Sequence, residues 1–250
     1  MKKHLSALAV MALIAGSAAL PQQPRQELEK TLNVSCGASS VAKTARSAVL
    51  ASPQNRNRAY TEVSVSTTPG NCANNSKLFI ASSSSGSHYK LVFLQEPTEL
   101  QTGNGIKIVD WSHDDRLLLF EVIQWQYGSD ARPEEHILIY DSQSGVFLPV
   151  RVDFVEKFGP GCVMKIDPLG FSSTNQAILE ISARQDYHEE GAPLTPRCAE
   201  QKGLWSYDPS SYKVKPLPSG TRVEHWGLIS TDFGSSGIPL GGAEHHSMDR

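Results

Sequence analysis

Short apolar runs, separated by clusters of Gly, Pro, Ser, Asn and Asp, make up most of the chain. Runs of this length, bounded by turn-forming residues, are typical of β-strands. The pattern predicts strands over residues 58–66, 78–82, 89–94, 106–110, 117–123, 137–141, 146–152, 162–167, 177–182, 204–208 and 212–217.

Three serines recur at a constant spacing. Ser52, Ser112 and Ser172 are 60 residues apart, and each lies in a short polar segment that precedes a predicted strand. Serine, threonine and aspartate side chains in such segments satisfy the amides of a tight turn. The spacing therefore predicts an internal repeat of about 60 residues.

The second unit shows how a repeat could pack. Trp111 precedes its serine, as Phe171 does in the third unit, and an aromatic side chain there can lie between adjacent sheets. The strand after the turn begins with residues 117–120, which are all apolar, as expected when both faces are covered by neighbours. Ala51 takes the aromatic position in the first unit.

Hairpin signals complete the units. Tyr140-Asp141 is followed by Ser144-Gly145, and Tyr207-Asp208 is followed by Ser210-Ser211. Each unit then has about four antiparallel strands. We predict an all-β domain over residues 45–230, built from antiparallel four-stranded sheets in units 45–100, 101–155 and 156–218, as a partial or small β-propeller-like arc.

The run 111–120, Trp-Ser-His-Asp-Asp-Arg-Leu-Leu-Leu-Phe, resembles the TolB-type β-propeller repeat, which is WD40-like and has the signature W-S-P-D-G before an apolar strand. Ile139-Tyr140-Asp141 is similar to the next strand and turn of that repeat. Asp115 stands where the family prefers glycine, which implies a looser turn. The resemblance covers residues 45–218 and implies a fold, but no particular function.

Three units are fewer than the four to eight or so blades of a closed propeller. The chain could form a partial arc, an arc that closes by dimerisation, or an irregular β-sandwich. Exposed end faces would leave apolar surface uncovered. Candidate covers are residues 26–35, of which 26–32 predict a short helix, and residues 223–229.

The N-terminus predicts export. Lys2 and Lys3 precede an apolar run over residues 5–14, and small residues follow over 16–19, as in a secretory signal peptide of residues 1–19. The alternative is an uncleaved anchor helix. The lysines are typical of bacterial signals, which predicts a periplasmic or extracellular protein. Residues 20–44 form an N-terminal segment, and the Gly- and Ser-rich residues 231–250 predict a disordered tail.

Four cysteines remain after the signal, and an even number in an exported chain favours disulfides. Cys36 and Cys72 are 36 residues apart, as are Cys162 and Cys198. The equal spacing predicts two bridges, each within one unit. A site for a metal ion on all four thiolates is the alternative, but paired C-x-x-C motifs are absent.

Composition narrows the function classes. The chain has 23 Lys and Arg against 26 Asp and Glu, a formal net charge of −3, which excludes a polybasic nucleic-acid binder. No second long apolar run predicts a membrane span after the signal. Neither a Walker-type nor a dinucleotide-binding glycine loop is present, so no cofactor is predicted.

Two loops are longer than a hairpin requires, and both occupy the same place in their units. They should therefore lie on one rim, where binding residues commonly gather. The candidate ligand- or partner-binding residues are Trp125, Tyr127, Asp130 and Arg132 in the first loop, and Asp186, Tyr187, His188, Glu189 and Glu190 in the second. The second set could also supply metal ligands or an acid–base pair, but its spacing matches no zinc signature.

A five-residue motif offers one more alternative. Ser85-Gly86-Ser87-His88-Tyr89 fits S-G-x-x-Y, which resembles the protruding loop of periplasmic lysozyme inhibitors. The same residues lie where the repeat requires a hairpin. Our main prediction is an exported, non-catalytic binding or scaffolding protein of the cell envelope, whose partner is another protein or a second copy. A periplasmic hydrolase acting on glycan or peptide, and a lysozyme-inhibitor-like protein, are the alternatives.

Overall fold

Three antiparallel β-sheets make up the part of the chain that the computed structural model describes, namely residues 44–65, 72–85, 88–151, 164–183 and 202–230. The first sheet contains β1 (Thr44–Arg46), β2 (Val49–Ala51), β3 (Asn57–Val65), β4 (Asn74–Ser82), β5 (Lys90–Gln95) and β14 (Leu228–Ser230). The second contains β6 (Gly103–Trp111), β7 (Leu117–Trp125), β8 (Glu134–Asp141) and β9 (Val146–Pro149). The third contains β10 (Met164–Phe171), β11 (Ala177–Ala183), β12 (Gly203–Asp208) and β13 (Lys213–Pro216).

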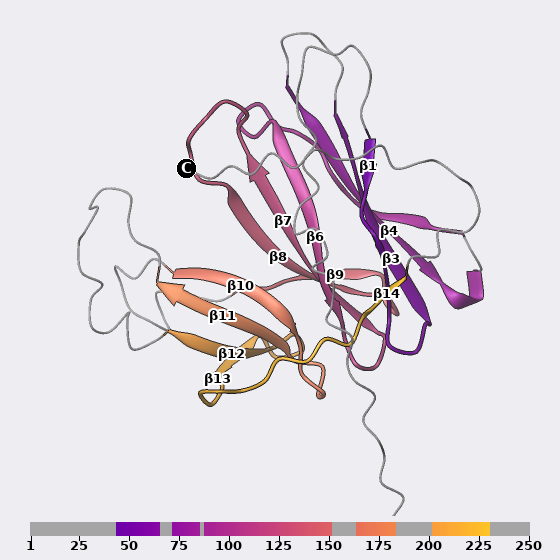
Figure 1. Ribbon diagram of the computed structural model, residues 1–250, viewed down its shortest axis with the longest axis vertical. Coiled ribbons are helices and arrows are strands. Elements are labelled where there is room, and N and C mark those ends of the chain that lie inside the picture. Colours follow the sequence, from indigo (N-terminus) through magenta and orange to yellow (C-terminus); the bar gives the residue numbers. More distant parts are fainter. Residues whose placement is uncertain (1–43, 66–71, 86–87, 152–163, 184–201, 231–250) are drawn as a thin grey trace, which may run out of the picture.

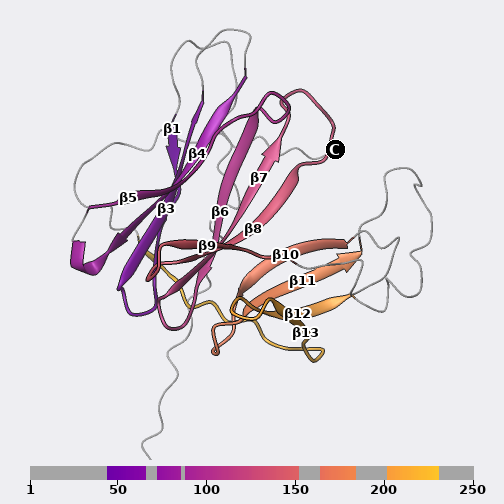
Figure 2. The ribbon, with the colours of Figure 1, turned by 180° about the vertical axis from the view of Figure 1, so that it is seen from behind.

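The strand orders are simple. They are β14-β2-β3-β4-β5 with β1 also paired to β3, then β6-β7-β8-β9, then β10-β11-β12-β13. The second sheet lies between the other two, and the two opposite views agree on this arrangement (Figures 1 and 2). Every strand predicted from the sequence overlaps an observed strand, and the all-β fold class with repeated antiparallel sheets is confirmed.

The three equally spaced serines occupy equivalent turns, one in each sheet. The backbone N–H of Ser52, Ser112 and Ser172 donates across the turn to the carbonyl of Asn57, Leu117 and Gln176 at 2.8 Å in each case. Each serine hydroxyl also accepts the N–H of that same residue, at 3.0, 2.8 and 3.1 Å. The residue three places after each serine has positive φ: 57° for Asn55, 67° for Asp115 and 61° for Asn175. The repeat is thus a repeat of geometry as well as of sequence.

The apolar strand β7 faces two cores. Leu118 and Phe120 belong to the cluster between the first and second sheets, whereas Leu117 and Leu119 belong to the cluster between the second and third. All four side chains are buried. Because both faces of the middle sheet are covered, β7 can begin with four consecutive apolar residues.

Trp111 and Phe171, the aromatic residues before the turns, are fully buried between sheets. The indole N–H of Trp111 donates to the carbonyl of Leu50 in the first sheet at 3.0 Å. The side chain therefore contributes both apolar area and a directional contact to the seam between the sheets.

The end of the described chain returns to its beginning. β14 pairs antiparallel with β2, with Ile229 opposite Leu50, and Ile229 packs on the core between the first and second sheets. Residues 223–229, a candidate cover for an end face, instead cross from the third sheet to the inner edge of the first (Figure 1). The second candidate, residues 26–35, lies outside the described residues.

The outward face of the third sheet differs from the expected apolar end face. Cross-strand pairs there include Ser206 with Lys215 and Asp208 with Lys213. Ile178 and Leu204 are the apolar members of this face. Ile178 and Ser206 are buried, whereas Glu180, Lys213 and Lys215 are exposed charged side chains that can remain hydrated.

Candidate binding surface

The first predicted binding loop starts with two half-buried aromatic rings. Trp125 and Tyr127 meet edge to face, with 5.8 Å between ring centroids. The Trp125 ring lies against Gly103 so closely that a Cβ added to the glycine would be 2.1 Å from the indole Nε1. Only glycine leaves room for the ring at this position.

Tyr127 binds a buried pair of asparagines. Its hydroxyl donates to Asn74 Oδ1 at 2.9 Å. Asn104 donates its Nδ2 to the carbonyl of Asn74 at 2.8 Å and its backbone N–H to Asn74 Oδ1 at 3.1 Å. Both asparagines are buried, and burial raises the pKa of Tyr127. This network joins the first and second sheets, so Tyr127 already has a structural contact where the sequence predicts a ligand contact.

The other predicted binding residues divide into two groups. Asp130 and Arg132 are exposed in the same loop. The remaining candidates, Asp186, Tyr187, His188, Glu189 and Glu190, lie outside the described residues, so the common rim stays a prediction.

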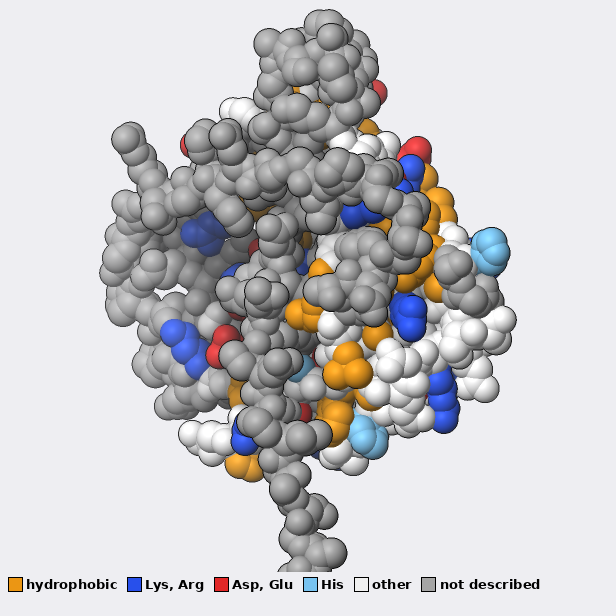
Figure 3. Space-filling model, turned by 45° about the vertical axis from the view of Figure 1, so that its right-hand side comes forward, with side chains coloured by type: hydrophobic (Ala, Val, Ile, Leu, Met, Phe, Trp, Pro, Cys, Tyr) orange, Lys and Arg blue, Asp and Glu red, His pale blue; other side chains and the backbone are white. Residues whose placement is uncertain are grey.

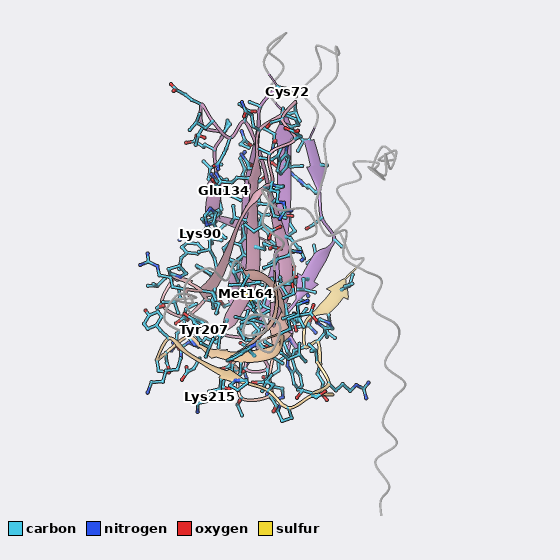
Figure 4. The ribbon with its side chains drawn as sticks, turned by 90° about the vertical axis from the view of Figure 1, so that its left-hand side faces the viewer. Cys72, Lys90, Glu134, Met164, Tyr207 and Lys215 are labelled. Carbon is cyan, nitrogen blue, oxygen red and sulfur yellow. The ribbon has the colours of Figure 1, made fainter. Side chains whose placement is uncertain are left out.

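Three of the four cysteines, Cys36, Cys162 and Cys198, also lie outside the described residues. Cys72, at the end of the long axis opposite Lys215 (Figure 4), is not a free thiol, and its pairing with Cys36 stays a prediction.

The lysozyme-inhibitor motif falls at an edge of the first sheet. Ser83–Ser85 form a short 3₁₀ turn, and Gly86 and Ser87 lie outside the described residues. The ring of Tyr89 meets the Tyr60 ring edge to face at 4.8 Å between centroids. Tyr89 is therefore packed on the outward face of the sheet.

A group of charges lies where the second sheet meets the third. Lys107 Nζ is 3.2 Å from Glu121 Oε2, and Glu121 is buried. Burial raises the pKa of the Glu121 carboxyl, and the Lys107 ammonium opposes that shift. On β10, Lys165 Nζ contacts Asp167 Oδ1 at 2.8 Å. Each buried or half-buried charge here has a partner, as a structural ion pair requires.

The described residues contain no group of three or more side chains suited to hold a metal ion.

The outward face of the first sheet carries an aromatic stack. Tyr60 and Phe79 are opposite each other on β3 and β4, with centroids 4.9 Å apart and nearly parallel rings. The Arg46 guanidinium lies 5.5 Å from the centroid of the Tyr60 ring and donates to Glu62 at 2.7 Å. Cation–π and charged contacts together fix this arrangement.

Two leucines extend the stack into solvent. Leu91 pairs with Phe79 and Leu94 with Lys77, so both side chains lie on the outward face of β5. They are 42% and 43% exposed. Apolar side chains gather on this side of the molecule in Figure 3, beside lysine, arginine and histidine. We call Leu91, Leu94 and the Tyr60–Phe79–Tyr89 rings the β5 patch.

Two aspartates have roles that the sequence analysis missed. Asp115 is 2% exposed; its Oδ1 accepts the N–H of Gln54 at 2.9 Å, and its carbonyl accepts Asn57 Nδ2 at 2.7 Å. It therefore joins the turn of the first sheet to that of the second, which glycine could not do through a side chain. The second, Asp110, is fully buried and accepts backbone N–H groups from Trp226 and Gly227 at 3.1 and 2.8 Å.

Comparisons with known proteins identify no relative. No protein-family model, no curated protein and no solved structure matches the chain. Among the described residues, none of the helical segments has the length and hydropathy needed to cross a bilayer.

Proposed function

We propose that this protein is an exported, non-catalytic binding module that docks a protein partner on the β5 patch. The observation that carries the proposal is the exposure of Leu91 and Leu94 next to an ordered aromatic stack. Apolar side chains beside anchored aromatic rings are typical of the centre of a protein interface.

The contrast between the two end faces supports the same site. The third sheet exposes charged side chains on its outward face (Glu180, Lys213 and Lys215), whereas the first sheet exposes Leu91 and Leu94 beside aromatic rings. The edge strand β13 carries Lys213, Lys215 and Pro216. Lysine and proline disfavour association with another strand at a sheet edge. β5 has the sequence Lys-Leu-Val-Phe-Leu-Gln, with a single lysine and no proline.

The proposal also includes export of the protein and the interpretation of its three sheets as blade-like units. The tripartite N-terminus supports export to the periplasm or beyond. The shared serine turn supports the similarity to a TolB-type repeat. A rigid scaffold of packed sheets that carries one apolar patch is suited to binding, because little conformational freedom is lost when a partner docks.

A peptide selection tests the proposal. Random peptides displayed on phage are selected on the full chain, and enriched peptides are measured on the Leu91→Asp/Leu94→Asp double variant. We expect their binding to fall by about 100-fold, since two buried apolar contacts would be replaced by charges. The matched control is Val146→Asp, at a residue 49% exposed on the edge strand β9, which should leave binding unchanged. If no peptide is enriched, or if enriched peptides bind the double variant equally well, the β5 patch is not the docking site.

A further inference from the structure

The segment over residues 224–230, which we call the clasp, contacts all three sheets, and we call the surface that these contacts define the groove. β14 adds to β2 of the first sheet, and the indole N–H of Trp226 donates to the carbonyl of Phe171 in the third sheet at 2.8 Å. The Trp226 ring also meets the ring of His113, from the second sheet, at 4.5 Å between centroids.

Asp110 is the centre of the groove. Its Oδ1 accepts the N–H groups of Trp111 and Gly227 at 3.0 and 2.8 Å, and its Oδ2 accepts the N–H of Trp226 at 3.1 Å. His225 Nδ1 lies 3.5 Å from Oδ2. A buried carboxylate that receives successive backbone N–H groups recognises an extended chain through its main chain, whatever the side chains are.

Shape adds selectivity at two positions of the clasp. A Cβ on Gly227 would lie 2.9 Å from Leu50 Cγ and 3.0 Å from Asp110 Oδ1, so any other residue there would force these side chains to shift. The preceding position is filled by Trp226, whose indole has its own acceptor. The groove therefore reads an aromatic–glycine dipeptide followed by a short strand.

The connection to the third sheet is a turn that projects into solvent. Leu217 still bonds to Leu204, and Thr221 closes a turn onto the carbonyl of Pro218 at 3.1 Å. Residues 218–220 are exposed, and no atom lies within 4 Å of a Cβ added to Gly220. The clasp is thus joined to the third sheet through a turn whose residues 218–220 are exposed.

We propose that this groove is a receptor site for an extended peptide with an aromatic–glycine dipeptide, and that the clasp is a ligand from the same chain that occupies it. Strand addition to β2 supplies main-chain hydrogen bonds, and the Asp110 and Phe171 contacts set the register. A partner segment with the same pattern competes with the clasp for the groove. This site lies at the inner edge of the first sheet and is separate from the β5 patch.

A nicked form of the full chain tests the proposal. A protease recognition sequence is inserted between Ser219 and Gly220, the purified protein is cleaved, and gel filtration shows whether the C-terminal fragment remains bound. A fluorescent peptide with the sequence of residues 221–230 is then added, and its anisotropy is measured. We expect the fragment to co-elute and the peptide to replace it.

Because the substitutions are made in the peptide, they leave the folding of the protein unchanged. The equivalent of Gly227→Ala should weaken binding by roughly tenfold, and that of Trp226→Ala by roughly 100-fold. A scrambled peptide of the same composition is the control. Release of the fragment without capture of the peptide, or equal binding of the parent and alanine peptides, would overturn the proposal. Because neither result involves Leu91 or Leu94, both leave the proposed function at the β5 patch standing.

Discussion

Replacing Asp115 with glycine separates two explanations of the repeat turn. The residue has φ of 67°, a conformation in which glycine is favoured over other residues by about 1 kcal/mol. If the turn were its only role, Asp115→Gly would be neutral or stabilising. The carboxylate, however, accepts the Gln54 N–H across the seam between sheets.

The magnitudes decide which effect dominates. A hydrogen bond to a charged group contributes about 1.5–3 kcal/mol to the free energy of unfolding. Arg56 lies 3.6 Å from the other carboxylate oxygen but is 65% exposed, so its ion pair adds little. After subtraction of the backbone gain, Asp115→Gly should lower the free energy of unfolding by about 0.5–2 kcal/mol.

Urea unfolding followed by tryptophan fluorescence measures this change as a shift of the midpoint at constant slope. Asn55→Gly is the matched control, because Asn55 has φ of 57° in the equivalent turn and an exposed side chain. It should be as stable as the parent or more stable by up to about 1 kcal/mol, which is the backbone gain alone. Equal midpoints for Asp115→Gly and Asn55→Gly would refute the inter-sheet role of Asp115.

Three further outcomes are expected. Trp111→Phe removes the donor to the Leu50 carbonyl and should destabilise the protein by about 1–3 kcal/mol in urea unfolding; a variant as stable as the parent would contradict the seam contact. Arg116 holds the pKa of the Asp141 carboxyl well below its ordinary value of 3.8, so the stability gained from that carboxylate is complete above this pH and is lost as the pH falls below it. The deficit of Asp141→Asn relative to the parent should therefore shrink in acid unfolding series, and a constant deficit from pH 7 to about pH 2 would argue against the pairing. Mass spectrometry of the mature, non-reduced protein should detect no free thiol and should link Cys36 to Cys72 and Cys162 to Cys198; two alkylated cysteines would disprove the two-bridge prediction.

Local patterns predicted the parts of the fold that depend on local chemistry. The serine turns follow from side-chain oxygens near the amides they satisfy, and β7 follows from a run of apolar residues. β2 and β14 were missed because three residues are too few to show an alternation. Their pairing joins residues from opposite ends of the domain, and no periodicity encodes that pairing.

The candidate sites were less predictable for a similar reason. In the sequence, Asp110 is one acidic residue in the segment before a turn. Its hydrogen-bond partner Gly227 is 117 residues away. Tyr127 reads as an exposed loop aromatic, but its hydroxyl contacts Asn74, which is 53 residues away. Burial and long-range hydrogen bonds distinguish a structural polar residue from a binding residue, and neither property is visible in composition or spacing.

The pairing of β14 with β2 also constrains the order of folding. The first sheet contains residues from both ends of the domain, so β2 has β3 on one side but lacks its second neighbour until the chain has been synthesised as far as Ser230. Long-range pairings of this kind close late and slow the folding of β-proteins. An emerging chain can form its middle sheet first, and the final strand then completes the sheet that began the sequence.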